Sequence, residues 1–182
     1  MKEEFISALR RRLASTTVGP SAVRGMGPKG TVFAARDFLA NIDVKKFNNK
    51  TEREFILSLN KTTQLFVKKM PDGAKHWGTA RKLLNLFLRA VVYNRFLCEK
   101  YNLYHIEPWL EVPLDSNVAE GLRSELTGET LPKWKTVIGL DKKTSHIYQT
   151  FASEIARAKG ENRVHLDLIY WRRDFVTAKS RK

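Results

Sequence analysis

The chain has 182 residues, and its 33 lysines and arginines against 19 aspartates and glutamates give a net charge of +14. This length suits a single domain, and a hydrophobic content of 42% excludes a chain that is mostly disordered. No apolar run reaches the roughly 18 residues of a membrane span, and residues 1–4 carry two acids but no signal-peptide core. We therefore expect a cytoplasmic protein of one domain, residues 1–182.

The basic composition favours a polyanionic partner, because lysines and arginines that neutralise phosphates release condensed counterions. Nucleic acid is the commonest such partner, although positive charge can also simply keep a protein soluble. Cys98 is the only cysteine, and the four histidines are widely spaced. These facts exclude an internal disulfide, a four-cysteine zinc site and an iron–sulfur cluster, so we expect no metal and no cofactor.

Apolar residues recur three and four positions apart along almost the whole chain, a spacing that predicts helices. The predicted helices of the first half cover residues 1–13, 29–40, 51–70 and 79–101. A glycine-rich loop that carries Arg24 separates the first two. The third begins with a capping box, in which Thr51 is the N-cap and Glu54 lies three residues on. Pro71 and Gly73 then end it.

A proline-containing stretch over residues 105–114 is predicted to be irregular or extended. The predicted helices of the second half cover residues 116–125, 131–134, 143–159 and 164–177. Asp115 is a good N-cap for the first of them, and Gly160 ends the third. No segment has a convincing strand pattern, and no repeat is visible, so the predicted fold class is all-α.

The predicted helix over residues 79–101 has one polar face. Lys82, Asn85 and Arg89 share that face, and Gly78 lies at the helix start, where free N–H groups suit a phosphate. The other faces carry apolar residues that we expect in the core: Leu84, Phe87, Leu88 and Val91. A solvated stripe on an ordinary amphipathic helix is the simpler alternative for the polar face.

Two acids in the second half stand out. Asp115 lies at a helix start, where capping alone explains an aspartate. Asp167 and Trp171 are four residues apart and share a helix face, and apolar neighbours predict that this acid is half-buried. A buried carboxylate needs a donor, which could be Arg163, Arg172 or a ligand.

Together these segments resemble the helix–hairpin–helix DNA glycosylases, and most closely their archaeal 8-oxoguanine DNA glycosylase branch. Gly78-Thr79-Ala80-Arg81-Lys82 is similar to the turn that opens the family's lysine-bearing helix, with alanine where its second glycine is usual. Pro113-Leu114-Asp115-Ser116-Asn117-Val118-Ala119 is similar to the segment that carries the catalytic aspartate. His165-Leu166-Asp167-Leu168-Ile169-Tyr170-Trp171 resembles the last helix of the archaeal branch.

The resemblance implies a compact helical glycosylase fold of two small lobes, with a helix–hairpin–helix-like element over about residues 51–101. The N- and C-terminal helices would form the second lobe. It implies that Lys82 and Asp115 are catalytic and that Asp167 and Trp171 bind a base flipped out of double-stranded DNA. The implied DNA-contacting residues are Gly78, Arg81, Arg89 and Arg24.

For such an enzyme we expect a monomer, with or without AP-lyase activity. Two substrates fit the resemblance. An oxidised purine such as 8-oxoguanine would make the protein a repair enzyme, and a hypermodified phage base would make it a defence enzyme.

Two alternatives stay open. Gly139-Leu140-Asp141-Lys142-Lys143-Thr144 also resembles the hairpin turn and would make Asp167 the catalytic acid, but an aspartate replaces its second glycine. The other alternative is a non-catalytic helical protein that binds DNA or RNA through phosphates. Trp77, Trp109 and Arg24 are weaker candidates for the pocket or for a wedge between strands, and each has a simpler structural explanation.

Overall fold

The computed structural model describes residues 2–128 and 130–171, which form eight α-helices, four short 3-10 helices (η) and no strand. The prediction of an all-α fold is confirmed. The first half contains α1 (Glu3–Thr17), η1 (Pro20–Val23), α2 (Thr31–Asn41), η2 (Val44–Phe47), α3 (Glu52–Lys69), α4 (Trp77–Tyr93) and α5 (Arg95–Tyr101). The second half contains η3 (Tyr104–Trp109), α6 (Ser116–Arg123), α7 (Lys142–Ala158), η4 (Arg163–His165) and α8 (Leu166–Trp171).

Side-chain caps fix the starts of two helices that position the site. Thr51 Oγ1 accepts a hydrogen bond from Glu54 N at 3.3 Å, and Asp115 Oδ1 accepts one from Val118 N at 3.1 Å, so both predicted N-caps are confirmed. The return bond of the capping box differs from the expected one. The Glu54 carboxylate accepts from Lys50 N at 3.0 Å, one residue before the cap.

The prediction of one continuous helix over residues 79–101 is wrong. Helix α4 ends at Tyr93, and the side chain of Asn94 accepts a hydrogen bond from Leu97 N at 3.1 Å, which starts α5. Asparagine is a poor interior helix residue and a good cap, because its side chain competes for backbone hydrogen bonds.

The predicted short helix over residues 131–134 is also wrong. The Pro132 carbonyl accepts hydrogen bonds from the Tyr148 hydroxyl at 2.7 Å and from Arg123 at 3.2 Å, so side chains replace the helical partners of this carbonyl. The predicted last helix begins as η4 and continues as α8, and residues 172–177 of that prediction lie outside the described part of the chain.

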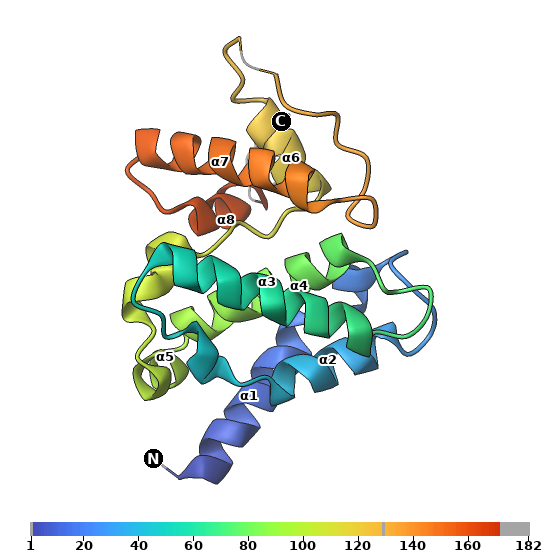
Figure 1. Ribbon diagram of the computed structural model, residues 1–182, viewed down its shortest axis with the longest axis vertical. Coiled ribbons are helices and arrows are strands. Elements are labelled where there is room, and N and C mark those ends of the chain that lie inside the picture. The colour runs from blue at the N-terminus through green and yellow to red at the C-terminus, as the bar shows by residue number, and fades with distance from the viewer. Residues whose placement is uncertain (1, 129, 172–182) are drawn as a thin grey trace, which may run out of the picture.

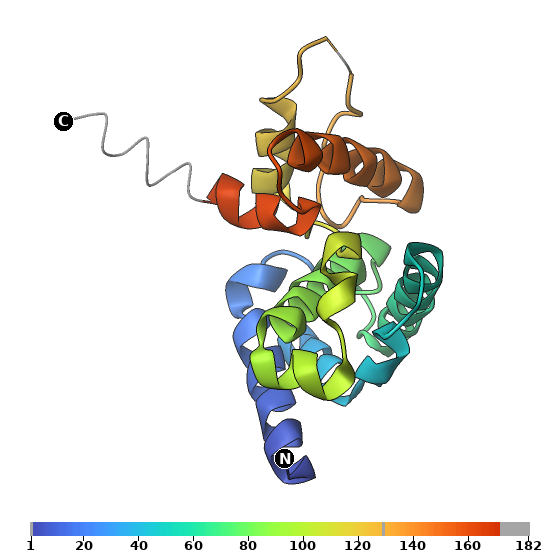
Figure 2. The same ribbon diagram turned by 90° about the vertical axis from the view of Figure 1, so that its left-hand side faces the viewer.

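The helices form two layers. Helices α1 to α5 make the larger layer, and α6 to α8 lie against one side of it, as both ribbon views show (Figures 1 and 2). We expected the N- and C-terminal helices to share a second lobe, but α1 and α2 pack in the larger layer with α3 and α4. Residues 110–115 form the extended connection from the larger layer to the smaller one.

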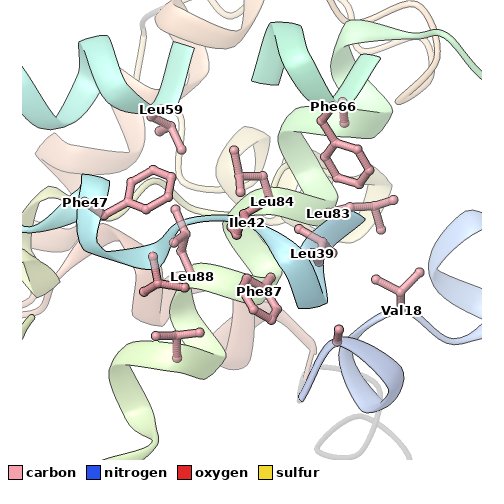
Figure 3. Packing of buried hydrophobic residues seen from close by; sticks show 14 of the residues in the cluster. Val18, Leu39, Ile42, Phe47, Leu59, Phe66, Leu83, Leu84, Phe87 and Leu88 are labelled. Atoms are coloured by element: carbon pink, nitrogen blue, oxygen red, sulfur yellow. The ribbon is translucent and has the colours of Figure 1, made fainter. Parts of the chain in front are cut away.

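Each layer has its own apolar core. In the larger layer, Leu83, Leu84, Phe87 and Leu88 of α4 point toward side chains of α2 and α3 (Figure 3). The core residues predicted on α4 are all fully buried: Leu84, Phe87, Leu88 and Val91. The smaller core is formed by residues of α6, α7 and α8 and of the connection: Val112, Leu114, Val118, Ala119, Leu122, Tyr148, Phe151, Leu166 and Tyr170. Among the described residues no helix is long and apolar enough to cross a membrane.

Candidate active site between the two layers

A cleft of about 390 Å³ opens where the two layers meet. Its lining combines residues of η1, α4, α6 and α8: Ser21, Ala22, Lys82, Leu86, Arg89, Asp115, Asn117, Asp167, Leu168 and Trp171. The volume lies within the range of small-molecule sites in proteins. The structure therefore brings together, in one cleft, the four residues that the sequence singles out as catalytic or base-binding.

Lys82 and Asp115 form an ion pair across the layers. Lys82 lies in the second turn of α4, and its Nζ is 3.3 Å from Asp115 Oδ2. The other carboxylate oxygen of Asp115, Oδ1, accepts the capping bond of α6. The Lys82 side chain is only 9% exposed, so the solvated-stripe alternative does not hold for this lysine. The cap orients the carboxylate, and the remaining oxygen faces the amine.

Asp167 pairs with Arg89 inside the cleft. Burial raises the pKa of the Asp167 carboxyl above its ordinary value, and the Arg89 guanidinium opposes this shift only in part. The predicted half-buried acid with an arginine partner is thus present, but the partner is Arg89. Arg163 instead donates to the carbonyls of Trp109 and Leu110, and Arg172 lies outside the described residues.

Trp171 lies at the end of α8 and borders the same cleft, one helical turn beyond Asp167. Its side chain is 61% exposed, which is unusual for a tryptophan. Apolar Leu86 and Leu168 also line the cleft. An aromatic face, a carboxylate and apolar walls together suit a flat ring that carries N–H donors.

The residues expected to contact phosphate are spread over different environments. Arg24 is exposed just after η1, close in sequence to the cleft-lining Ala22. Arg89 lines the cleft but is paired with Asp167. Gly78 and Arg81, which we also expected at phosphate, are buried and do not line the cleft.

The burial of Gly78 and Arg81 has clear local causes. A Cβ at Gly78 would lie 2.1 Å from the carbonyl oxygen of Val137, so the turn before α7 fills the space beside this glycine. The Arg81 guanidinium makes a double hydrogen bond to Glu111 and lies 5.3 Å from the Trp77 ring centroid. Gly78 therefore lies where α4 meets the turn before α7, Arg81 ties α4 to the connection, and neither residue lines the cleft.

The rival motif, the second segment that resembles the hairpin turn (residues 139–144), does not line the cleft. Asp141 Oδ1 accepts from Thr144 N at 2.7 Å and caps α7. Lys142 and Lys143 are exposed, and neither lines the cleft that contains Asp167. The structure therefore does not bring this motif together with its expected acid. Of the weaker candidates, Trp109 packs edge-on against His105 outside the cleft.

The sequence did not single out several residues of the site. Ser21 and Ala22 line the cleft, although the sequence of this loop points only to its glycines and Arg24. Asn117 lies two residues beyond Asp115 in the same motif, which was the available signal. Glu111 gave no signal, because only the folded chain brings it to Arg81.

A lysine amine beside a carboxylate, within a cleft that also offers an acid and an indole, can perform nucleophilic chemistry on a small flat group. In the described ranges no group of three histidine, cysteine, aspartate or glutamate side chains could hold a metal ion. Comparisons with protein-family models, curated proteins and solved structures found no match. The geometry of this cleft and the motifs that form it are therefore the features that point to a function.

Proposed function

We propose that the protein is a DNA glycosylase, which flips a damaged or modified base out of double-stranded DNA and removes it. One observation supports this most directly: Lys82, Asp115, Asp167 and Trp171 line the same cleft, although they come from three separate motifs. The α3–loop–α4 pair and the two apolar cores are consistent with a two-lobed glycosylase fold containing a helix–hairpin–helix-like element.

Lys82 would act as the nucleophile. Attack requires loss of its proton, and the Asp115 carboxylate is placed to accept that proton and pass it to the departing base. The neutral amine attacks C1′, and the N-glycosidic bond breaks with its electron pair leaving on the base. In the resulting adduct the C1′–O4′ bond breaks, O4′ takes a proton from the nitrogen, and Lys82 is left as a protonated Schiff base. Water hydrolyses this Schiff base and returns the free amine. Once the base has taken the proton, Asp115 is ionised again and stabilises the positive charge on the sugar adduct.

Asp167 and Trp171 would recognise the flipped base. The Asp167 carboxylate accepts N–H donors from the base, and the Trp171 indole stacks on its face. Arg89 holds the carboxylate within the cleft and offsets part of the effect of burial, which raises the pKa of Asp167. The cleft would receive either an oxidised purine in repair or a hypermodified phage base in defence.

The positive surface would hold the DNA around this cleft. A net charge of +14 provides the electrostatic attraction, and exposed Arg24 on the loop beside the cleft is placed to meet a phosphate. We expect the protein to act as a monomer in the cytoplasm. We also expect no metal or cofactor, because the proposed chemical step uses only Lys82 and Asp115.

The decisive experiment incubates the protein with a panel of lesion-bearing duplexes and modified phage DNAs. Released bases are identified by mass spectrometry, and covalent adducts are trapped with borohydride. Lys82→Gln and Asp115→Asn should each lower base release by on the order of 10² to 10³-fold or more, while DNA binding persists. Lys143→Gln, in the rival motif, is the matched control and should leave release unchanged.

The outcomes separate the alternatives. A borohydride adduct with the wild type and none with Lys82→Gln supports a Schiff-base lysine. Released base without an adduct indicates a glycosylase that uses water. DNA or RNA binding with neither product across the whole panel would support the non-catalytic alternative, and unchanged release by both active-site variants would contradict the assignment.

A further inference from the structure

The connection between the two layers is held at three consecutive residues by three different elements. The Leu110 carbonyl accepts from Arg163 of η4 at 2.9 Å. Glu111 accepts from Arg81 of α4 at 2.7 and 2.8 Å. Val112 exchanges two hydrogen bonds with the Gln149 side chain of α7, at 3.1 and 2.7 Å. This extended segment has no regular backbone hydrogen bonds of a helix or sheet, and these side-chain bonds fix its path instead. The segment leads directly to Asp115.

The pair of Arg81 and Glu111 is fully engaged within the protein. The two residues are 4% and 7% exposed. Besides its two hydrogen bonds to Glu111, Arg81 donates to Asn60 Oδ1 and to Thr63 Oγ1, each at 3.0 Å. Glu111 also accepts from Asn85 at 3.0 Å. The guanidinium thus donates to the connection through Glu111 and to α3 through Asn60 and Thr63, and it is buried away from DNA.

The place of this pair in the chain links it to the site. Arg81 directly precedes Lys82 on α4, and Glu111 lies four residues before Asp115 on the connection. A planar guanidinium bound through two N–H groups fixes direction as well as distance, which a lysine or an apolar contact does not do. The pair thus joins the backbone that carries the amine to the backbone that carries the carboxylate.

We infer that Arg81 and Glu111 are a positioning pair, which sets the 3.3 Å separation of Lys82 and Asp115, with Gln149 holding the connection on its other side. This inference rests on the proposed function for its catalytic consequence. A displacement of about 1 Å between reacting groups lowers rates by roughly 10²-fold. Loss of the paired hydrogen bonds between Arg81 and Glu111 should therefore slow the chemical step and leave the affinity for DNA unchanged.

Arg81→Lys tests the inference, because lysine keeps the positive charge but cannot make the two parallel hydrogen bonds to Glu111. We expect single-turnover base release to fall by roughly 10²-fold, while the Kd for the same duplex stays within about twofold. Gln149→Met removes the bonds to Val112 without leaving a buried charge, and we expect a fall of roughly tenfold. Arg123→Lys on α6 is the matched control and should leave both quantities unchanged.

A second readout does not depend on catalysis. A water-soluble carbodiimide converts the Asp115 carboxylate to an O-acylisourea, and the Lys82 amine attacks its acyl carbon to form an amide with release of a urea. Peptide mass spectrometry quantifies this cross-link. The wild type and Arg123→Lys should give this cross-link, and Arg81→Lys and Gln149→Met should give less of it. If the wild type cross-links but releases no base from any substrate, the proposed function fails while the positioning inference stands.

The inference is overturned if folded Arg81→Lys keeps both the wild-type rate and the wild-type cross-link yield. A fall in rate without a fall in cross-link yield would also overturn it, since Arg81 would then act in another way. Circular dichroism at the assay temperature verifies folding. If Arg81→Lys does not fold, Gln149→Met decides, and wild-type behaviour of that variant in both readouts contradicts the inference.

Discussion

Asp115 shows how one side chain combines a structural and a chemical task. Its Oδ1 caps α6 by accepting from Val118 N, and its Oδ2 pairs with the Lys82 amine. The cap holds the carboxylate in one orientation before any substrate arrives. A capping aspartate is an ordinary feature of a helix start, so only the second oxygen distinguishes this residue from a purely structural one.

Substitution of Asp115 should separate these two tasks. Both Asp115→Asn and Asp115→Ala lose the ion pair with Lys82, so both should lose base release. Asparagine is as good an N-cap as aspartate, so Asp115→Ala should be less stable than Asp115→Asn by about 1 kcal/mol. Urea denaturation with a parallel release assay measures both quantities. Equal stability of the two variants would show that the cap contributes nothing.

At the scale of elements, His165 connects α8 to its surroundings. Its Nδ1 is 2.5 Å from a Glu161 oxygen and its Nε2 is 2.8 Å from a Glu107 oxygen of η3. Burial lowers the pKa of the imidazole, but these two hydrogen bonds outweigh it, so the pKa is raised above 6.5. When it is protonated, the imidazole therefore helps to hold the element that carries Asp167 and Trp171.

This arrangement predicts a pH dependence of stability. Because the folded pKa of His165 exceeds the unfolded value, its contribution is fully present below about pH 6.5 and is lost as pH rises through the folded pKa. We expect a loss of roughly 0.5–1 kcal/mol, which is the size of a solvent-screened ion pair. His165→Gln should remove this dependence in urea denaturation, whereas His146→Gln, at an exposed histidine of α7, should retain it. An unchanged profile in His165→Gln would contradict the assignment.

At the scale of the whole molecule, the site depends on close contact between the layers. Both ion pairs of the cleft cross between layers, one from Lys82 to Asp115 and the other from Arg89 to Asp167. Gly78 allows this approach, because α4 begins directly against the turn before α7. The absence of a side chain at one buried position thus permits the close contact of the two layers.

Gly78→Ala tests this dependence through the sign of its effect. Helix propensity alone predicts stabilisation by up to about 1 kcal/mol. The added Cβ would lie 2.1 Å from the Val137 oxygen, so we expect a loss of about 1–3 kcal/mol in the free energy of unfolding instead. Gly139→Ala is the control on the same turn, since its nearest contact would be an ordinary 3.4 Å to Thr136. Stabilisation by Gly78→Ala would show that the layers are loosely joined.

Much of the fold could be predicted because its signals are local. The spacing of apolar residues on α4 and the caps Thr51 and Asp115 each depend on a few neighbouring residues, and the structure bears them out. The break between α4 and α5 could not be predicted, because apolar residues continue at helical spacing on both sides of Asn94. A single asparagine was the only local sign of the break.

The sequence by itself determined the helices, the basic character and the motifs that contain Lys82, Asp115, Asp167 and Trp171. Only the tertiary structure decided that these residues share one cleft, that Arg89 is the partner of Asp167, and that Arg81 faces Glu111 rather than solvent. The physical reason is that periodicity and capping act over a few residues. The partner of a buried charge, by contrast, is chosen by the packing of segments far apart along the chain.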